Sequence, residues 1–284
     1  MTTTILVTGA TGTIGAALVP ELVRRGATVR TMSRREHELS GTQNAVADLR
    51  DPASLERAVA GTDTVFLNSP SEPDAAMLQC RFADIAAAAG VRRLVLLSQY
   101  AADADSPVRF LRWHAEVEHH VRELGIDSTV LRPNLYMQGL LPFAANAART
   151  GALAAPIENA RVSAIDTRDI AEVAAAVLTE SGHAGATYTL TGPRAVTHAE
   201  IAAALSQATG LGISFAPVSA EQFAAALGSF LPSWQVDGLL EDYAHYDRGE
   251  AAEVYSTVSD LLGRPARSIE QFAHDHATAI SAAD

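Results

Sequence analysis

The chain has 284 residues, of which 48% are hydrophobic and 19% charged, and its 33 acidic residues outnumber 21 basic ones to give a net charge of −12. This composition is typical of a globular protein with a sizeable core, and it excludes a mainly disordered, collagenous or coiled-coil chain. It also argues against nucleic-acid binding through overall charge. We expect a cytoplasmic protein that does not enter membranes, because the sequence has neither a basic leader nor an apolar run of about 18 residues.

The counts of cysteine and lysine exclude several further kinds of site. Cys80 is the single cysteine, which excludes an internal disulfide framework and a cysteine-rich metal site. All 21 basic residues are arginine, so the chain has no lysine for a Schiff base, a phosphate-binding loop or a Tyr-Lys catalytic pair. The adjacent His119 and His120 point to different sides of a predicted helix, and we expect no metal site.

Short apolar runs alternate with helical patterns along the first two thirds of the chain, which is typical of a parallel sheet covered on both faces. The predicted fold is therefore α/β, a Rossmann-like doubly wound sheet. The expected strands are, in chain order, 5–7, 28–32, a short third strand before Asp48, 64–67, 93–97 and 128–131. The expected helices are 14–25, one from 51, 74–89 and 108–124.

The pattern changes after Gly151. We expect a NAD(P)-binding Rossmann domain over 1–150 and a smaller, mainly helical substrate region over 151–284. The second region is expected to pack on the sheet and partly to continue the Rossmann domain. Two further strand–helix units are predicted there, with strands at 161–165 and 187–190. Half of the 16 aromatic residues follow Gly210, and they form either a small helical core or a lid over a pocket that includes Trp234.

A glycine-rich turn follows the first predicted strand and leads directly into a helix. In such a turn Gly9 permits the tight bend, Gly12 lets the backbone approach a pyrophosphate, and Gly15 lets the helix pack against the strand. The free N–H groups at the helix start then bind the phosphates. The dinucleotide-binding segment comprises Gly9, Thr11, Gly12, Thr13, Ile14 and Gly15.

The residues after the second strand favour NADPH over NADH. Arg34 is best placed for a 2′-phosphate, with Ser33 and Arg35 assisting, because a guanidinium matches phosphate geometry. Glu36 favours NADH instead, since an acid could bind a ribose 2′-hydroxyl. Further cofactor contacts are expected near the adenine and along the nicotinamide side, from Asp48, Leu49, Asn68, Ser69 and Pro70.

These motifs resemble the NmrA-like, atypical short-chain dehydrogenase/reductases over nearly the whole chain. The resemblance includes the glycine turn and the segments 47–51, 94–98, 114–118, 129–134, 165–170 and 262–265. It implies a reductase of quinones, enones, ketones or iminium ions, or a redox-sensing regulator. It says little about the substrate.

The sequence departs from the Tyr-x-x-x-Lys pattern of classical members, because it contains no lysine. The resemblance to quinone-reductase and ergot-type members makes His114 the first candidate for donating a proton, or a hydrogen bond to a carbonyl, near the nicotinamide. An imidazole suits acid catalysis near neutrality. A histidine that lines the cleft without a chemical role is the alternative. Ser98 stands where the family has its catalytic serine, and either Ser98 or Tyr100 is expected to hold a substrate oxygen.

The loop after the strand at 128–131 approaches the nicotinamide and the substrate in the family. By this resemblance Pro133 and Asn134 are cofactor contacts, and Tyr136 and Met137 are substrate walls, although Met137 is equally suited to filling the core.

Three functions compete at this point. The leading hypothesis is an NADPH-dependent reductase that transfers hydride to a small planar electrophile bound as a small-molecule substrate. The alternative is a non-catalytic NADP(H) sensor, which would also tolerate the loss of the Tyr-Lys pair. A nucleotide-sugar epimerase or dehydratase is disfavoured, because such enzymes generally keep that pair. A homodimer is left open.

Overall fold

The computed structural model describes residues 3–282, and the chain divides into two compact units. Unit 1 consists of Met1–Asp105, Leu111–Arg132 and Thr167–Thr189, whereas unit 2 consists of Ser106–Phe110, Pro133–Asp166 and Leu190–Asp284. Each unit is thus assembled from separate stretches of chain. The segment 167–189 belongs with the first unit, although it lies beyond residue 151.

Unit 1 is built on a seven-stranded sheet, and the predicted doubly wound fold is confirmed. β1 pairs in parallel with β2 on one side and with β4 on the other, so the strand order reverses at β1. Ligands bind at the carboxyl ends of strands beside such a switch point. Across the sheet the strands are β3 (Thr42–Val46), β2 (Thr28–Ser33), β1 (Thr4–Val7), β4 (Thr64–Leu67), β5 (Arg93–Leu97), β6 (Asp127–Pro133) and β8 (Thr187–Leu190).

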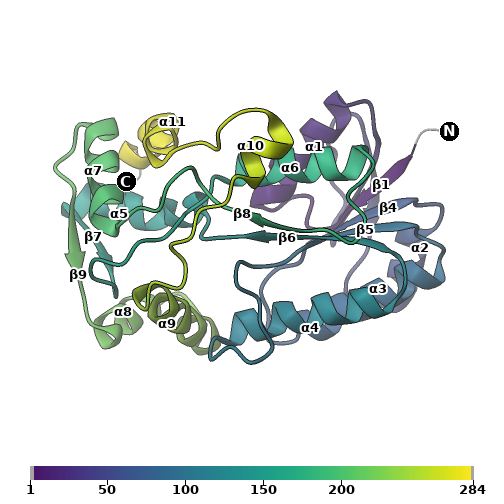
Figure 1. The fold of residues 1–284 in the computed structure, drawn as a ribbon, viewed down its shortest axis with the longest axis horizontal. Coiled ribbons are helices and arrows are strands. Elements are labelled where there is room, and N and C mark those ends of the chain that lie inside the picture. Colours follow the sequence, from purple (N-terminus) through teal and green to yellow (C-terminus); the bar gives the residue numbers. More distant parts are fainter. Residues whose placement is uncertain (1–2, 283–284) are drawn as a thin grey trace. The chain divides into compact units, whose positions relative to one another are not determined.

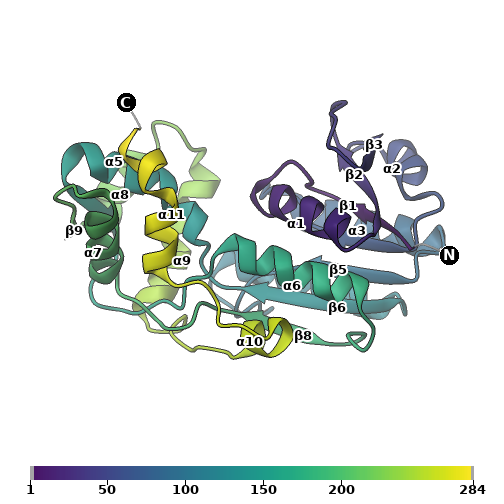
Figure 2. The same cartoon turned by 90° about the horizontal axis from the view of Figure 1, so that it is seen from above.

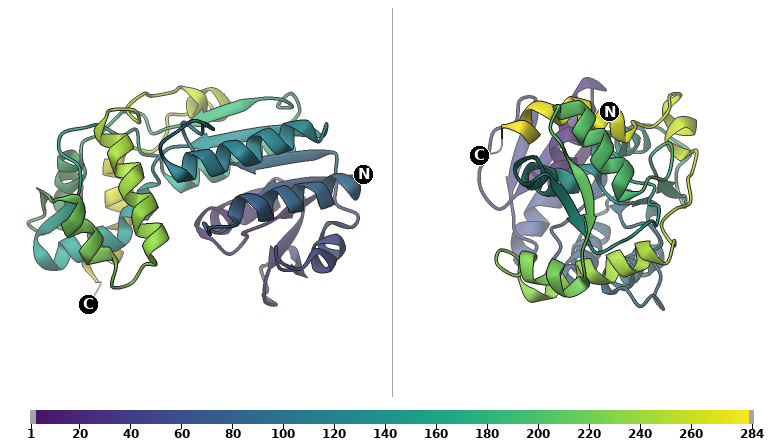
Figure 3. Two further views of the ribbon diagram at one scale, coloured as in Figure 1. Left: turned by 90° about the horizontal axis from the view of Figure 1, so that it is seen from below. Right: turned by 90° about the vertical axis from the view of Figure 1, so that its left-hand side faces the viewer.

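Helices cover both faces of this sheet. α1 (Thr13–Arg24) and α6 (Thr167–Thr179) pack side by side on one face, as the view from above shows (Figures 1 and 2). α2 (Pro52–Val59), α3 (Ala75–Ala88) and α4 (Arg109–Glu123) cover the other, and α3 and α4 lie in front of the strands in the view from below (Figure 3).

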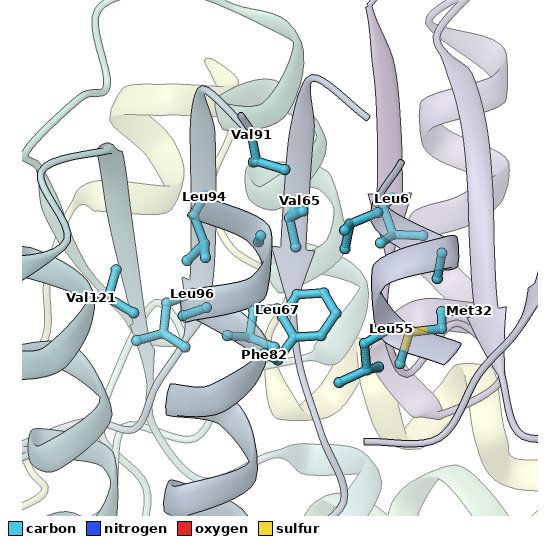
Figure 4. Packing of buried hydrophobic residues seen from close by; sticks show 14 of the residues in the cluster. Leu6, Met32, Leu55, Val65, Leu67, Phe82, Val91, Leu94, Leu96 and Val121 are labelled. Atoms are coloured by element: carbon cyan, nitrogen blue, oxygen red, sulfur yellow. The ribbon is translucent and has the colours of Figure 1, made fainter. Parts of the chain in front are cut away.

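One part of the core of unit 1 lies between the sheet and the second set of helices. Figure 4 shows Leu6, Val65 and Leu94 from neighbouring strands packed with Phe82 from α3, and all four side chains are fully buried. Burial of each such side chain contributes about 1.5–3 kcal/mol. Strands buried on both faces need continuous apolar runs, which is why these runs identify the strands in the sequence.

Unit 2 combines helices with a small sheet. β7 (Ala152–Ala155) and β9 (Ser214–Pro217) form a parallel pair. Thr197 and Glu200 form the capping box that their spacing predicts, because each side chain accepts a hydrogen bond from the other's backbone N–H at 3.1 and 2.7 Å. The remaining elements are η1 (Met137–Leu140), α5 (Leu141–Thr150), α7 (His198–Thr209), α8 (Ala220–Leu227), α9 (Ser233–Asp247), α10 (Thr257–Leu262) and α11 (Ile269–Ser281).

The predicted strand at 161–165 is wrong. Only two isolated bridges occur there, Val162 with Val196 and Tyr136 with Ile165. The sequence also gave no indication of β7 and β9, since four-residue strands of mostly small side chains carry no clear apolar alternation. Within residues 3–282 no helix is long and apolar enough to cross a membrane.

Candidate functional site

The glycine turn lies at the switch point of the unit 1 sheet. Gly9 has a φ of +61°, and a Cβ on Gly15 would lie 2.2 Å from the carbonyl oxygen of Gly9. Glycine is therefore required at the first position by backbone conformation and at the second by space. The two residues together allow α1 to begin directly beside the end of β1.

The side chain of Thr8, the residue directly after β1, ties this turn to the residue directly after β4. The Thr8 hydroxyl donates to the Asn68 carbonyl oxygen at 2.6 Å and accepts from the Asn68 backbone N–H at 2.8 Å. Asn68 is thereby held next to Gly9, because a Cβ on that glycine would lie 3.0 Å from Asn68 Nδ2. The half-buried Ser69 and the exposed Pro70 continue the same loop.

The start of α1 is open and can hold phosphates. Gly12 precedes the helix without a side-chain cap, and the first turn contains no acid. Thr11, Gly12 and Thr13 are exposed, whereas Ile14 is buried against the core. A helix N-terminus presents unpaired N–H groups and a positive dipole end, which fit a pyrophosphate.

Two exposed arginines follow β2. Neither Arg34 nor Arg35 forms an ion pair with another described residue of unit 1. By contrast, Arg50 in the loop after β3 is paired with Asp74 and Glu72 just before α3, and hydrogen bonds to these two carboxylates raise its pKa. The arginines after β2 therefore retain their full capacity for an anion.

A histidine that sequence reasoning missed lies beside the same site. His37 Nδ1 is 2.7 Å from Ser33 Oγ and 2.9 Å from Nδ2 of Asn44, which is on β3. The Ser33 hydroxyl also donates to the carbonyl oxygen of Arg35, so it shapes the loop that carries the arginines. The contact between His37 and Asn44 depends on the neighbouring strand β3, and no local sequence motif reveals it.

Asp48 and Leu49 are both half-buried. Asp48 Oδ1 accepts from the Arg50 backbone N–H at 2.8 Å, and its own N–H donates to Ser54 Oγ at 3.1 Å. Leu49 packs against the core of unit 1. Both residues thus shape the loop before α2, and their contact with an adenine stays a prediction.

A buried carboxylate fixes Ser98 at the end of β5. The Ser98 hydroxyl donates to Glu118 Oε1 at 2.5 Å, and Arg132 donates to both oxygens of Glu118 at 2.8 and 2.6 Å. Arg122 adds a fourth hydrogen bond at 2.6 Å. Burial would raise the pKa of Glu118, but the hydrogen bonds from Arg132, Ser98 and Arg122 outweigh it and hold the pKa below its usual range.

This network restricts what Ser98 can do. Its proton is directed to an ionised carboxylate, so its oxygen can accept a further hydrogen bond but cannot donate one without losing Glu118. The catalytic role of Ser98 stays a prediction, since the side chain is only 2% exposed.

His114 lies on α4, one turn before Glu118, and is half-buried. Burial lowers its pKa to about 4, although the negative charge of Glu118 acts in the opposite direction. A pKa this low leaves the ring neutral at pH 7, and the role of His114 as a donor near the nicotinamide stays a prediction. A neutral imidazole still carries one N–H donor, and the ring has no hydrogen-bond partner among the described residues of unit 1.

Tyr100 follows Ser98 in a constrained loop and is 8% exposed. The next residue, Ala101, has a φ of +57°, a left-handed conformation that is uncommon for a residue with a Cβ. Such strain is concentrated at functional sites. The positive φ of Ala101 therefore identifies this loop as a candidate functional segment, which the sequence alone does not do.

Asn134 serves the fold of unit 2. Its side-chain amide donates to Ser163 Oγ at 2.8 Å and to the Ala251 carbonyl at 2.9 Å, and its oxygen accepts from the Leu135 N–H at 2.8 Å. The first two bonds join Asn134 to residues 29 and 117 positions away, and Pro133 beside it is buried. Cofactor contact by Pro133 and Asn134 stays a prediction.

The predicted substrate walls differ in their surroundings. Met137 is 2% exposed and lies in the core of unit 2, which supports its core-filling alternative. Tyr136 is half-buried, and burial raises its pKa, so its phenol is neutral; within unit 2 its hydroxyl has no hydrogen-bond partner. Trp234 packs edge-on against Phe110, with ring centroids 6.3 Å apart.

Several aromatic residues of unit 2 form one cluster around Tyr243. Its ring lies 5.2 Å from Phe223, 5.7 Å from Tyr246 and 5.6 Å from His198, measured between centroids. These side chains are 1–7% exposed, so they form a helical core. Burial lowers the pKa of His198 to about 4, and neither of its ring nitrogens has a partner in unit 2.

Comparison with known proteins shows the family of this chain. Residues 1–272 match the model of the NmrA-like family. The chain belongs to the NmrA-like family. This membership confirms the resemblance on which the choice of His114 and Ser98 depends.

Three relatives illustrate the family's chemistry. An NAD(P)H azoreductase of Xenophilus azovorans is 38% identical, with 98% of this chain and 100% of the relative covered. A (4-alkanoyl-5-oxo-2,5-dihydrofuran-3-yl)methyl phosphate reductase of Streptomyces griseus is 37% identical, with 98% and 99% covered. The structure of an Escherichia coli NADPH-dependent quinone oxidoreductase with NADPH has a TM-score of 0.88 at 28% identity, with 95% and 99% covered. These relatives confirm two predictions: the protein is an oxidoreductase, and its cofactor is NADP(H).

Proposed function

We propose that this protein is an NADPH-dependent reductase whose acceptor is a small planar molecule with a conjugated π-system. One observation carries the cofactor assignment: the uncapped start of α1 and two exposed arginines without ion pairs lie after neighbouring strands of one sheet. The first suits a pyrophosphate and the second a 2′-phosphate.

The acceptor class rests on what the relatives are named for. Their names specify an azo reduction, an unsaturated oxo-dihydrofuran and a quinone. Each of these groups contains an electron-poor double bond, or a double bond conjugated to an electron-poor centre. Such a group can accept a hydride. We place the reaction in the cytoplasm, because a reductase needs a compartment that regenerates reduced nicotinamide.

Bound NADPH would supply the hydride. The chain's contribution is to bind and orient, through the glycine turn and the arginines after β2, and to stabilise the electron pair that the acceptor gains. His114 fits the second task because its ring is neutral at pH 7 and retains an N–H donor. The acceptor oxygen or nitrogen receives this hydrogen bond, and water delivers the final proton.

A neutral donor has a consequence for the choice of acceptor. A quinone or an azo compound accepts hydride without prior protonation, whereas an unactivated ketone needs a stronger acid. With no lysine in the chain and His114 unprotonated at pH 7, we expect conjugated acceptors to be reduced and saturated ketones to be left unchanged.

The test is the loss of reduced-nicotinamide absorbance with NADPH and NADH against a quinone, an azo dye, an enone and a saturated ketone. We expect steady NADPH oxidation with at least one conjugated acceptor and none with the ketone. NADPH that binds tightly but is consumed with no acceptor would contradict the reductase and favour the sensor.

A further inference from the structure

Side chains at both ends close the short segment that carries the two arginines of unit 1. Ser33 is the last residue of β2 and His37 stands four residues later, so the two enclose Arg34, Arg35 and Glu36. Nδ1 of His37 lies 2.7 Å from Ser33 Oγ. The three enclosed residues are exposed. The contact between Ser33 and His37 therefore restrains a segment that faces solvent.

Asn44 on β3 binds both ends of this segment. Its Nδ2 lies 2.9 Å from His37 Nδ1 and 3.4 Å from Ser33 Oγ, and its Oδ1 accepts from the His37 backbone N–H at 3.4 Å. Nδ2 also lies 3.4 Å from the carbonyl oxygen of Thr31 on β2. An amide carries a donor and an acceptor on one short side chain, so a single residue can bind the ring and the backbone of His37 together. We call Asn44, Ser33 and His37 the loop clamp.

The sheet of unit 1 determines where Asn44 lies. In the parallel pairing of β2 with β3, Asn44 is opposite Thr31 and Val46 is opposite Ser33. The Ser33 carbonyl oxygen accepts from the Ala47 backbone N–H at 2.9 Å, so the end of β2 is held by backbone as well. The loop clamp is therefore anchored on a regular strand and not on the loop that it closes.

The loop clamp restrains the backbone of the segment and leaves its guanidinium groups available. The Ser33 hydroxyl donates to the carbonyl oxygen of Arg35. Among the described residues of unit 1, no carboxylate pairs with Arg34 or Arg35. A ligand binds at a lower cost in entropy when the groups that contact it are already ordered. A restrained backbone with free guanidinium groups is such an arrangement for a phosphate.

We propose that Asn44 and His37 are positioning residues for the 2′-phosphate of NADPH, and that they set the preference for NADPH over NADH by holding segment 34–36 in one conformation. The inference rests on the proposed function, in which Arg34 and Arg35 bind that phosphate. Neither Asn44 nor His37 touches the dinucleotide in this account. NADH has no 2′-phosphate, so its affinity does not depend on the loop clamp.

Asn44→Ala removes every side-chain contact of the loop clamp that comes from β3. We expect the Kd for NADPH to rise about 5-fold and the Kd for NADH to change less than 2-fold when each is titrated into the variant. The retained NADH affinity also shows that the variant is folded. Gln43→Ala is the matched control, since Gln43 is the preceding residue of β3 and is exposed, and both Kd values should stay within 2-fold. Native NADPH affinity in Asn44→Ala, or an equal loss for both dinucleotides, would overturn the proposal.

Two substitutions of His37 test the contact at Nδ1 separately. Nδ1 of histidine and the terminal oxygen and nitrogen of asparagine are all bonded to Cγ, so an asparagine can place a polar atom where Nδ1 stands. We expect His37→Ala to reproduce the loss of NADPH affinity and His37→Asn to recover most of it. Equal losses in His37→Ala and His37→Asn would show that the Nδ1 contact does not position the segment.

A double-variant experiment distinguishes failure of this proposal from failure of the proposed function. If Asn44 acts only through the arginines, Asn44→Ala should have no further effect on NADPH affinity in a chain that already carries Arg34→Ala and Arg35→Ala. Losses that simply add would overturn the positioning role and leave the arginine site intact. Native NADPH affinity in the chain with Arg34→Ala and Arg35→Ala would instead remove the 2′-phosphate site of the proposed function, and the positioning role with it.

Discussion

The cofactor end of unit 1 and the aromatic cluster of unit 2 are built by different means. The first is made of backbone: Gly9 and Gly15 permit a turn, and α1 presents its own N–H groups. The second is made of side chains, such as Tyr243 and His198, that come from separate helices and meet only in the folded chain. A site made of backbone is visible in a short stretch of sequence, whereas one made of distant side chains is not.

This difference predicts which substitutions are least tolerated. In Gly15→Ala the new methyl group would lie 2.2 Å from a backbone oxygen that cannot rotate away. We expect NADPH affinity to fall at least about 100-fold, with a lower melting temperature, because α1 must move away from β1. Gly139→Ala is the matched control, since its φ is ordinary and nothing lies near its Cβ. Native affinity in Gly15→Ala would show that the turn does not form the site.

The next effect is on turnover. His114→Ala should lower kcat about 30-fold, which is about 2 kcal/mol of lost transition-state stabilisation, while the Kd for NADPH is maintained. In the native protein kcat should not fall as the pH rises through 6 to 7, because the imidazole already loses its proton near pH 4. His119→Ala is the control, since this residue lies on the same helix with a 74% exposed side chain. A kcat that declines with an apparent pKa near 6.5 would instead indicate an imidazolium acid.

The smallest effect concerns the aromatic cluster. The folded-state pKa of His198 is about 4, below the ordinary 6.5, so the unfolded chain binds more protons and stability is lost as the pH falls from about 6.5 toward 4. At pH 6 this histidine should cost about 1 kcal/mol relative to pH 8. His198→Phe should remove that part of the pH dependence in urea unfolding at the two pH values. A variant with the same pH dependence as the native protein would contradict a neutral, buried imidazole.

The features that the sequence predicts correctly are those that a local pattern of residues determines. The apolar runs of β1, β4 and β5, the glycine turn and the arginines after β2 are each contained in a few consecutive residues. By contrast, the hydrogen bonds of Glu118 with Ser98 and Arg132 join residues that are 20 and 14 positions apart. Sequence spacing alone gives no sign of them.

The same limit applies to the properties of single side chains. His114 was identified by resemblance, but its neutral state depends on burial, which the surrounding fold determines. Asn134 also joins three segments of unit 2 through hydrogen bonds with Ser163 and Ala251, which lie 29 and 117 residues away and which no local pattern reveals.

The cofactor assignment can be tested directly by titrating NADPH and NADH into the native protein and into Arg34→Ala. Arg57→Ala is the control, an exposed arginine on α2. If Arg34 binds the 2′-phosphate, its loss should weaken NADPH binding about 10-fold and leave NADH binding unchanged, so that the preference for NADPH nearly disappears. An equal loss for both dinucleotides would contradict the assignment of the 2′-phosphate to this site.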